Sequence, residues 1–388
     1  MVPRRDLLAA LTLGLPLAAC ARANAGCLSG AGESGVEWTD WEVFRRALVS
    51  EDGRVIDPMS RDATTSEGQS YALFFALVAG QQGLFDRLLR WTEDNLCGGD
   101  MASRLPAWQW GRREDGRWDV IDANAASDAD LWIAYTLAQA GRLWKNRRYE
   151  ALSQVLGRRI LADEVVELAG LGPTLLPGPK GFKLDEDSHR LNPSYLPPPL
   201  LAWFAAHRPE AAWRGLRSSS LQVLAGSAPR GLAPEWTVHV RGRGFVADRL
   251  TVEDRVGSYN AIRVYLWLGL THPDDPALSA LLRQFAAMAR LASQRGAVPE
   301  VVDPETGDAL ATSPDGPAGF QAALLPMLSR LGDRSVSQKL RARMDARPIQ
   351  PRHYYDQVLR LFASGHLDGR YQFAADGTLQ TRWAPCDA

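Results

Sequence analysis

Apolar residues recur at three- and four-residue spacing through most of the chain, and this pattern constrains the fold more than any other feature of the sequence. The segments that show it are 66–80, 84–96, 127–144, 148–165, 199–207, 211–225, 259–270, 276–295, 318–331, 335–346 and 354–364. No fixed-period repeat and no low-complexity linker divides them. The pattern predicts one all-α domain of paired antiparallel helices, because helix pairs in this number need a shared core. A closed ring of helix hairpins is one way to supply that core.

One stretch, 170–199, interrupts the helical pattern. It holds seven prolines and several glycines, which exclude a long helix. We expect a structured loop with short strands, such as one over 181–184.

Residues 1–25 have the pattern of an export signal. Two arginines precede an apolar run over 7–19, which is too short to span a membrane. A signal-peptidase site fits directly after this segment, whereas a lipoprotein signal fits before Cys20, which would then carry a lipid anchor. We therefore expect residues 26–388 to form one exported domain without a membrane span, in the periplasm or secreted.

The composition narrows the class of partner. The chain has 44 Lys and Arg against 45 Asp and Glu, so it has no excess of positive charge that would attract the phosphates of a nucleic acid. Nucleic acid is therefore not expected as a partner. Its 13 tryptophans outnumber its 11 phenylalanines and 9 tyrosines, which favours a ligand with flat faces such as a sugar. Of the cysteines beyond the signal, Cys27 and Cys386 lie near the two ends and could form one disulfide.

Two helix starts carry acidic residues in a capping pattern. Residues 66–69 read as a capping box, in which the Ser66 hydroxyl accepts from the backbone N–H of Gln69 and the Gln69 side chain reaches back. This places Glu67 in the first helical turn. Residues 127–130 repeat the device and place Asp128 in the first turn of another helix.

A third helix start, 257–263, holds Asn260 and Arg263, which are three residues apart and share a helix face. All three helices are apolar nearly all round after their first turn, so they belong inside the fold. If their N-termini point the same way, Glu67, Asp128, Asn260 and Arg263 converge at one end. A simpler explanation of the two acids is that they complement the helix dipole.

The segment 106–111 holds Trp108 and Trp110 among polar residues and glycine, where burial in a core is hard to arrange. We expect these two rings to stack on sugar. The histidines show no metal-binding spacing, and neither a phosphate-binding glycine loop nor a nucleophile elbow is present. The sequence therefore predicts no metal and no cofactor.

Four ordered motifs, at 66–71, 126–134, 192–195 and 257–265, resemble glycoside hydrolase family 8, and the resemblance spans about 38–364. It implies an (α/α)6 barrel that hydrolyses β-1,4-glucan internally, with inversion at the anomeric carbon and without metal or cofactor. Within the family, the motifs are most similar to the periplasmic endoglucanases of bacterial cellulose-synthesis operons. This implies a role accessory to cellulose synthesis, with a β-1,4-glucan chain and the cellulose export machinery as partners.

The resemblance also implies roles for individual residues. Glu67 matches the general acid that protonates the departing glycosidic oxygen, and Asp128 matches the acid that contacts the distorted sugar. Tyr195 and Tyr259 match tyrosines that line the substrate site, and Arg263 matches an arginine beside the base. A helix N-terminus lowers the pKa of Glu67, whereas an ionised Asp128 nearby raises it again.

The family's cellulases usually have an aspartate, the general base, where this chain has Asn260. An amide cannot take a proton, and inversion requires a second carboxylate with a water between it and the acid. Family chitosanases are similar in lacking this aspartate and use a glutamate from a neighbouring loop. Glu253, Asp254 and Asp248 are therefore candidate bases here. Two alternatives follow: a catalytically impaired glucan-binding or secretion accessory, or an enzyme for another β-1,4 polysaccharide such as chitosan.

Overall fold

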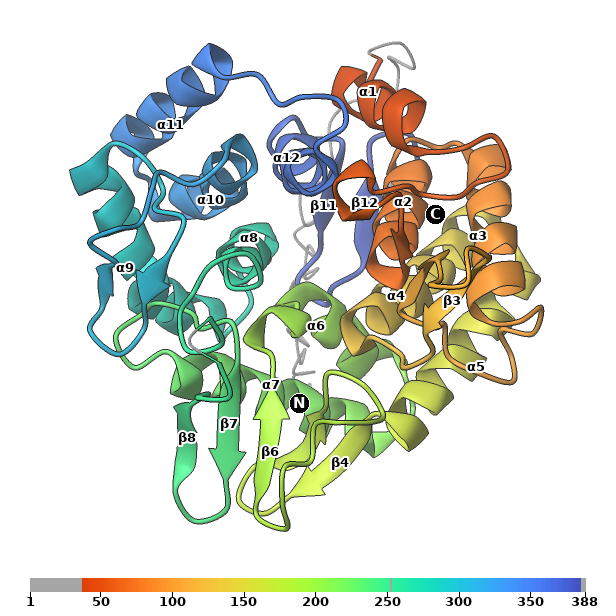
Figure 1. Ribbon diagram of the computed structural model, residues 1–388, viewed down its shortest axis with the longest axis horizontal. Helices are drawn as coiled ribbons and strands as arrows, with labels where there is room; N and C mark the ends of the chain where they lie inside the picture. The colour runs from red at the N-terminus through yellow and green to blue at the C-terminus, as the bar shows by residue number, and fades with distance from the viewer. Residues whose placement is uncertain (1–36, 252, 385–388) are drawn as a thin grey trace, which may run out of the picture.

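The computed structural model describes residues 37–251 and 253–384, which form twelve α-helices, twelve short strands and two 3-10 turns (Figure 1). The helices are α1 Thr39–Leu48, α2 Ser66–Val78, α3 Gln82–Leu96, α4 Ser127–Trp144, α5 Arg147–Asp163, α6 Pro198–His207, α7 Ala211–Ser227, α8 Ile262–Leu270, α9 Leu278–Arg295, α10 Ala318–Leu331, α11 Arg334–Ala346 and α12 Tyr354–Leu367. The 3-10 turns are η1 Pro58–Ser60 and η2 Pro193–Tyr195.

The strands pair in small antiparallel sheets between the helices, in the orders β1-β2-β3, β4-β5, β6-β7-β8, β9-β10 and β11-β12. They are β1 Thr64–Thr65, β2 Gln109–Arg112, β3 Trp118–Asp122, β4 Val165–Leu168, β5 Gly172–Leu175, β6 Ser188–Leu191, β7 Thr237–Val240, β8 Gly244–Ala247, β9 Val302–Asp303, β10 Asp308–Ala309, β11 Tyr371–Phe373 and β12 Leu379–Thr381.

The even-numbered helices form an inner ring, and the odd-numbered helices lie outside it (Figure 1). Successive inner helices contact one another from α2 to α12. The ring closes where Phe362 of α12 packs against Tyr71 and Phe74 of α2, with ring centroids 5.2 and 5.5 Å apart. The predicted (α/α)6 barrel is therefore confirmed.

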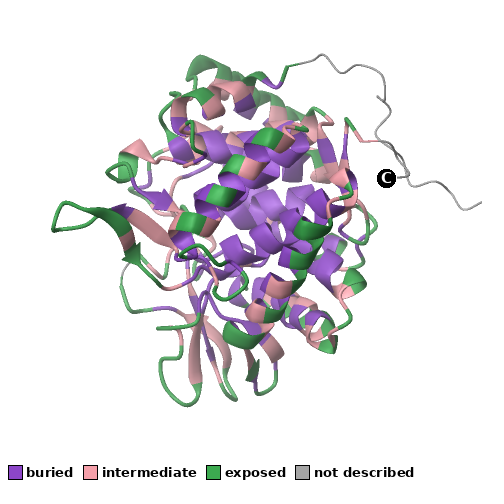
Figure 2. Ribbon diagram, turned by 90° about the vertical axis from the view of Figure 1, so that its right-hand side faces the viewer, coloured by how far each residue is buried: buried purple, intermediate pink, exposed green. Residues whose placement is uncertain are grey.

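The sequence pattern explains which helices lie inside. Twelve of the 13 residues of α2 and all nine residues of α8 are buried. The outer helix α3 instead buries one stripe, which includes Leu84, Phe85, Leu88 and Leu89. Figure 2 shows the resulting buried core, with exposed residues on the outer surfaces of the helices. Inner helices buried on every side position the residues at their ends with little freedom.

The predicted helices over 127–144 and 318–331 agree with α4 and α10 end to end. The helix predicted from residue 259 begins only at Ile262, and residues 258–261 form a turn before it. The sequence analysis missed α1, although its buried residues Trp41, Phe44 and Leu48 stand at three- and four-residue spacing. The strand predicted over 181–184 is reduced to an isolated antiparallel bridge between Lys183 and His189 of β6, because Gly181 has a φ of 90°.

The capping box predicted for α2 is also wrong. Thr65, not Ser66, caps the helix, and its hydroxyl accepts from the N–H of Gly68 at 3.1 Å. Gln69 is buried and points away from the cap: its side-chain oxygen accepts from the N–H of Val55 at 2.6 Å. On α4, the repeated device fails as well, because the N-cap residue is Ala126 and no side chain caps this helix.

The C-terminal segment covers one end of the barrel. The Tyr135 hydroxyl of α4 donates to the carbonyl of Gly377 at 2.7 Å, between β11 and β12. The indole of Trp383 donates to the carbonyl of Leu77, at the C-terminal end of α2, at 3.0 Å. The residues of interest lie at the opposite end, where α2 and α4 begin.

In the described part of the chain, no helix is both long and apolar enough to cross a membrane. The same residues contain no group of three His, Cys, Asp or Glu side chains that could hold a metal ion. The predicted export signal, Cys20, Cys27 and Cys386 lie outside the described residues. Cys97 is buried as a free thiol.

Candidate active site

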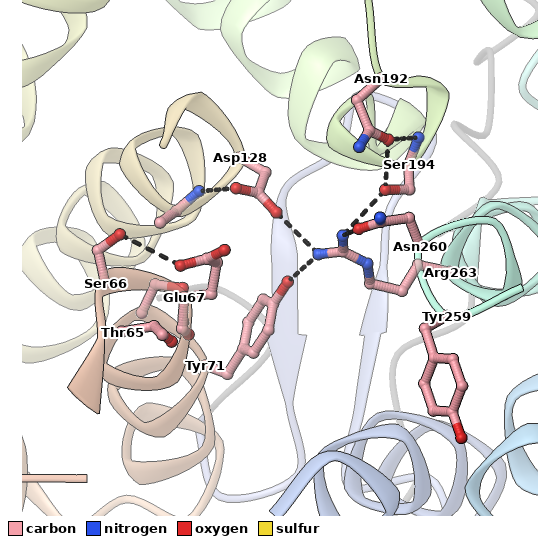
Figure 3. Close-up of polar contacts among 12 residues, drawn as sticks. Thr65, Ser66, Glu67, Tyr71, Asp128, Asn192, Ser194, Tyr259, Asn260 and Arg263 are labelled. Atoms are coloured by element: carbon pink, nitrogen blue, oxygen red, sulfur yellow. Dashed lines mark hydrogen bonds and ion pairs between the residues drawn. The ribbon is translucent and has the colours of Figure 1, made fainter. Parts of the chain in front are cut away.

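A buried arginine joins four elements at the end of the barrel where α2 and α4 begin (Figure 3). Arg263 Nη1 donates to Asp128 Oδ2 of α4 at 2.8 Å and to the Tyr71 hydroxyl of α2 at 3.0 Å. Its Nη2 donates to Asn260 Oδ1 at 2.7 Å and to Ser194 Oγ of η2 at 3.0 Å. The structure thus brings Asp128, Asn260 and Arg263 together, as their positions at helix starts predict.

Glu67 lies beside this network, in the first turn of α2, with its carboxyl group directed toward the space in front of Asp128 (Figure 3). Its Oε2 accepts from Ser66 Oγ at 3.4 Å. Burial, and after it the negative charge of Asp128, raise the pKa of Glu67 to about 7 against the opposing charge of Arg263. The carboxyl group therefore keeps its proton up to about neutral pH, which is the state a proton donor requires.

Asp128 is buried and forms an ion pair with Arg263. Burial raises the pKa of Asp128, whereas the guanidinium and the N–H of Ala129, which donates to Oδ1 at 2.9 Å, oppose this rise. The ion pair keeps negative charge next to Glu67. The predicted influence of Asp128 on Glu67 is therefore confirmed, although burial is the larger cause of the raised pKa.

The two tyrosines predicted to bind sugar have different surroundings. The ring of Tyr195, in η2, lies 5.4 Å from the Arg263 guanidinium carbon and is partly buried. Tyr259 is 48% exposed, packs edge-on against Phe320, and points away from Arg263 (Figure 3). Only Tyr195 faces the arginine network.

The two candidate tryptophans also differ. Trp110, in β2, stacks on Trp118 at 5.4 Å, and the Arg54 guanidinium lies 4.6 Å from its ring. Trp108 is partly exposed, and its carbonyl accepts from the N–H of Ser66 at 3.0 Å, so it adjoins the start of α2. The position of Trp108 suits contact with a ligand at Glu67 better than that of Trp110, whose ring already stacks on another indole.

Glu235 is a functional candidate that the sequence did not reveal. It lies in the loop before β7 and is 9% exposed. Its Oε2 accepts from Asn260 Nδ2 at 2.6 Å, and its Oε1 accepts from the backbone N–H groups of Ser258, Asn260 and Ala261 at 2.6, 2.9 and 3.0 Å. No local motif marks it, because 25 residues separate it from Asn260.

The three acids proposed from sequence as bases occupy other surroundings. Arg190 forms ion pairs with Asp248 at 2.5 Å and with Asp254 at 2.8 Å. Glu253 is exposed. Among the described carboxylates, Glu235 is the one that hydrogen-bonds Asn260.

A second pair of buried carboxyl groups consists of Asp130, on α4 two residues beyond Asp128, and Glu164, at the end of α5. Asp130 and Glu164 are both fully buried, and their carboxyl oxygens accept no hydrogen bond from a described N–H or O–H group. Burial and their mutual repulsion raise the pKa of Glu164, and burial raises that of Asp130. Burial therefore favours the protonated form of both carboxyl groups, and Asp130 does not complete the capping pattern expected over 127–130.

Comparisons with known proteins agree with this architecture. The family model described as glycosyl hydrolases family 8 matches residues 15–369. An endoglucanase of Xanthomonas axonopodis pv. citri is 44% identical over 351 residues, which cover 89% of each chain. An endoglucanase of Escherichia coli K12 is 42% identical over 348 residues, 89% of this chain and 91% of that one. The crystal structure of an endo-1,4-D-glucanase from Vibrio fischeri ES114 matches with a TM-score of 0.84 at 41% identity, covering 89% of this chain and 99% of that one.

Proposed function

The chain belongs to glycoside hydrolase family 8, and from this premise we propose that it is an endo-β-1,4-glucanase that cuts β-1,4-glucan chains internally with inversion. The observation that carries the proposal is the carboxyl group of Glu67, which keeps its proton to about pH 7 beside an Asp128–Arg263 ion pair. The endoglucanases that resemble this chain over nine-tenths of its length support the same substrate class.

The proposed reaction begins with Glu67. Its carboxyl group donates a proton to the glycosidic oxygen as the bond from that oxygen to the anomeric carbon breaks. Asp128 lies where its negative charge stabilises the positive charge that develops on the sugar ring, and Arg263 holds this carboxylate in place. Water adds to the opposite face of the sugar, and its proton requires an acceptor.

The partly exposed aromatic rings next to the site suit a flat pyranose ring. Trp108 adjoins the start of α2, and Tyr195 lies over Arg263. We propose that these two rings bind sugar on either side of the bond that is cut.

The substitution Glu67→Gln tests the proposal. Glutamine keeps the size of the side chain but cannot donate the proton, so release of reducing ends from carboxymethylcellulose should fall by about 10²–10⁴-fold. Glu150→Gln is the matched control, because Glu150 occupies the first turn of the outer helix α5 and is exposed. Unchanged activity of Glu67→Gln, with a parental melting temperature, would exclude Glu67 as the acid.

Asn260 supports a second candidate, a catalytically impaired protein that binds glucan or assists its secretion. An amide stands where the family's cellulases usually have their base, and its side chain cannot accept the water's proton. Binding of cellopentaose without release of reducing ends would favour this candidate. Faster release from chitosan than from carboxymethylcellulose would instead favour an enzyme for chitosan.

We also propose that the protein acts outside the cytoplasm, on glucan that the cellulose export machinery delivers. The signal pattern of residues 1–25 supports export, either as a free protein or with a lipid at Cys20. Fractionation of cells that express the full chain tests this, with a Cys20→Ser variant to separate the two routes.

A further inference from the structure

We propose that Glu235 is the general base of this reaction and replaces the carboxylate that position 260 lacks. This inference rests on the proposed function. It concerns a loop residue that lies 25 positions before Asn260 and contacts it directly.

The orientation of the Asn260 amide is fixed by its two neighbours. The guanidinium of Arg263 can only donate, so it must face the amide oxygen, and the bond between them is 2.7 Å. The carboxylate of Glu235 accepts, so it faces the amide nitrogen at 2.6 Å. Asn260 thus connects Arg263, which holds Asp128, to Glu235. The carboxylate missing at position 260 is present one hydrogen bond away.

The surroundings of Glu235 stabilise a negative charge. Three backbone N–H groups in the turn before α8 donate to its Oε1, as occurs where anions bind at helix starts. The other oxygen, Oε2, accepts from Asn260 alone among the described residues, through its amide and, at 3.0 Å, its backbone N–H. This makes Oε2 the better placed oxygen for a proton from water.

Backbone contacts hold the segment that contains Glu235 against the turn that contains Asn260. The N–H of Glu235 donates to the carbonyl of Val256 at 2.7 Å. A Cβ atom at Gly257 would lie 2.1 Å from the carbonyl oxygen of Ala233, so only glycine permits this approach. The contact between Glu235 and Asn260 therefore depends on backbone packing on both sides, which keeps the carboxylate in one place.

The other nearby acids are less suited to the role. Asp248 and Asp254 both form ion pairs with Arg190. The guanidinium carbon of Arg190 lies 4.0 Å from the ring centroid of Trp236. Neither carboxylate contacts Asn260, whereas Glu235 does. Glu253 is exposed to solvent.

In the proposed step, the oxygen of a water molecule forms a bond to the anomeric carbon while the bond from that carbon to the glycosidic oxygen breaks. The electron pair of the broken bond goes to the glycosidic oxygen, which takes the proton of Glu67. One proton of the water passes to Oε2 of Glu235. The products are an inverted hemiacetal and a free hydroxyl, and transfer of one proton from Glu235 to Glu67 through solvent restores the starting state.

The experiment exchanges the amide and the carboxylate. Glu235→Gln should lower kcat on cellopentaose by about 10²–10⁴-fold. The double variant Glu235→Gln with Asn260→Asp keeps one amide and one carboxylate in contact but moves the charge to position 260. Its kcat should be at least about tenfold higher than that of Glu235→Gln. Glu253→Gln, the control, should retain parental kcat.

A second measurement separates a base from a structural residue. Azide needs no base to attack carbon, so sodium azide should restore turnover of cellopentaose by Glu235→Ala and give a glycosyl azide of inverted configuration. Parental activity of Glu235→Gln would overturn the inference, as would loss of activity that neither azide nor the exchanged pair restores. A parent protein that releases no reducing ends would instead overturn the proposed function.

Discussion

A glutamate lies at the start of α2 and another at the start of α8, at the same end of the barrel: Glu67 and Glu235. Their surroundings differ in the number of backbone N–H groups that contact the carboxyl group. At α2, Thr65 caps the helix, and the carboxyl group of Glu67 is left with a hydroxyl contact and the charge of Asp128. At α8, the turn before the helix has no such cap, and Glu235 from a distant loop takes three of its N–H groups.

The difference shows how one residue type can supply both an acid and a base. Backbone N–H groups stabilise a carboxylate, whereas burial and a second negative charge stabilise the protonated form. At α2, burial and the charge of Asp128 raise the pKa of Glu67 to about 7, while Thr65 accepts from the N–H of Gly68. Because no side chain takes the donors at α8, they are free to hold the charge of Glu235.

The largest expected effect comes from Arg263→Met, which removes the connection between the two helix starts. Asp128 would be left buried without its partner, and breaking a buried ion pair typically costs about 3–5 kcal/mol. We expect a loss of this size in urea unfolding, together with loss of hydrolysis. Adding Asp128→Asn should recover part of the stability and none of the activity. A parental unfolding free energy for Arg263→Met would contradict the role of this arginine in joining the elements.

Asp128→Asn should have a smaller effect, because Arg263 keeps its hydrogen bonds to Tyr71, Ser194 and Asn260. Asp128 raises the pKa of Glu67, and Arg263 lowers it. Removing the aspartate removes the charge that raises this pKa and leaves the charge of Arg263 unopposed, so the pKa of Glu67 should fall. A general acid is active only while protonated, so the alkaline limb of kcat/KM, near pH 7 in the parent, should move to lower pH. The pH profile of hydrolysis measures this. A limb that stays in place would mean that the charge of Asp128 does not control Glu67.

Much of the fold and half of the site could be predicted from sequence, for a common reason. The inner helices are apolar nearly all round, so their boundaries are visible, and Glu67, Asp128 and Arg263 follow from the position of each helix start. Glu235 could not be found, because its partner is set by tertiary packing at Gly257 and no local pattern records it. The same applies to Gln69, whose helix-start pattern suggested a cap while its amide bonds a distant loop.

The sharpest test of the contrast between the two helix starts compares the stability of the protein after a glutamate-to-glutamine substitution at each of them. The pKa of Glu67 rises from an ordinary value of 4.5 to about 7 in the folded protein. Below pH 4.5 both folded and unfolded chains hold the proton, and ionisation does not affect stability. Between pH 4.5 and 7 only the unfolded chain ionises, so stability falls with rising pH, and the full penalty is present above pH 7. Glu67→Gln, which cannot ionise, should therefore raise the melting temperature at pH 8 and leave it nearly unchanged at pH 4.

Glu235→Gln should act in the other direction. Its amide offers one acceptor oxygen in place of two, and its NH2 group faces N–H donors, so buried donors at the start of α8 lose their partner. Leaving a buried donor unsatisfied costs about 1–3 kcal/mol, so the melting temperature should fall at pH 8. Calorimetry of both variants at pH 4 and pH 8 tests the pair. If both substitutions stabilised the protein at pH 8, the N–H groups at α8 would not be holding a charge, and the contrast between the two helix starts would be lost.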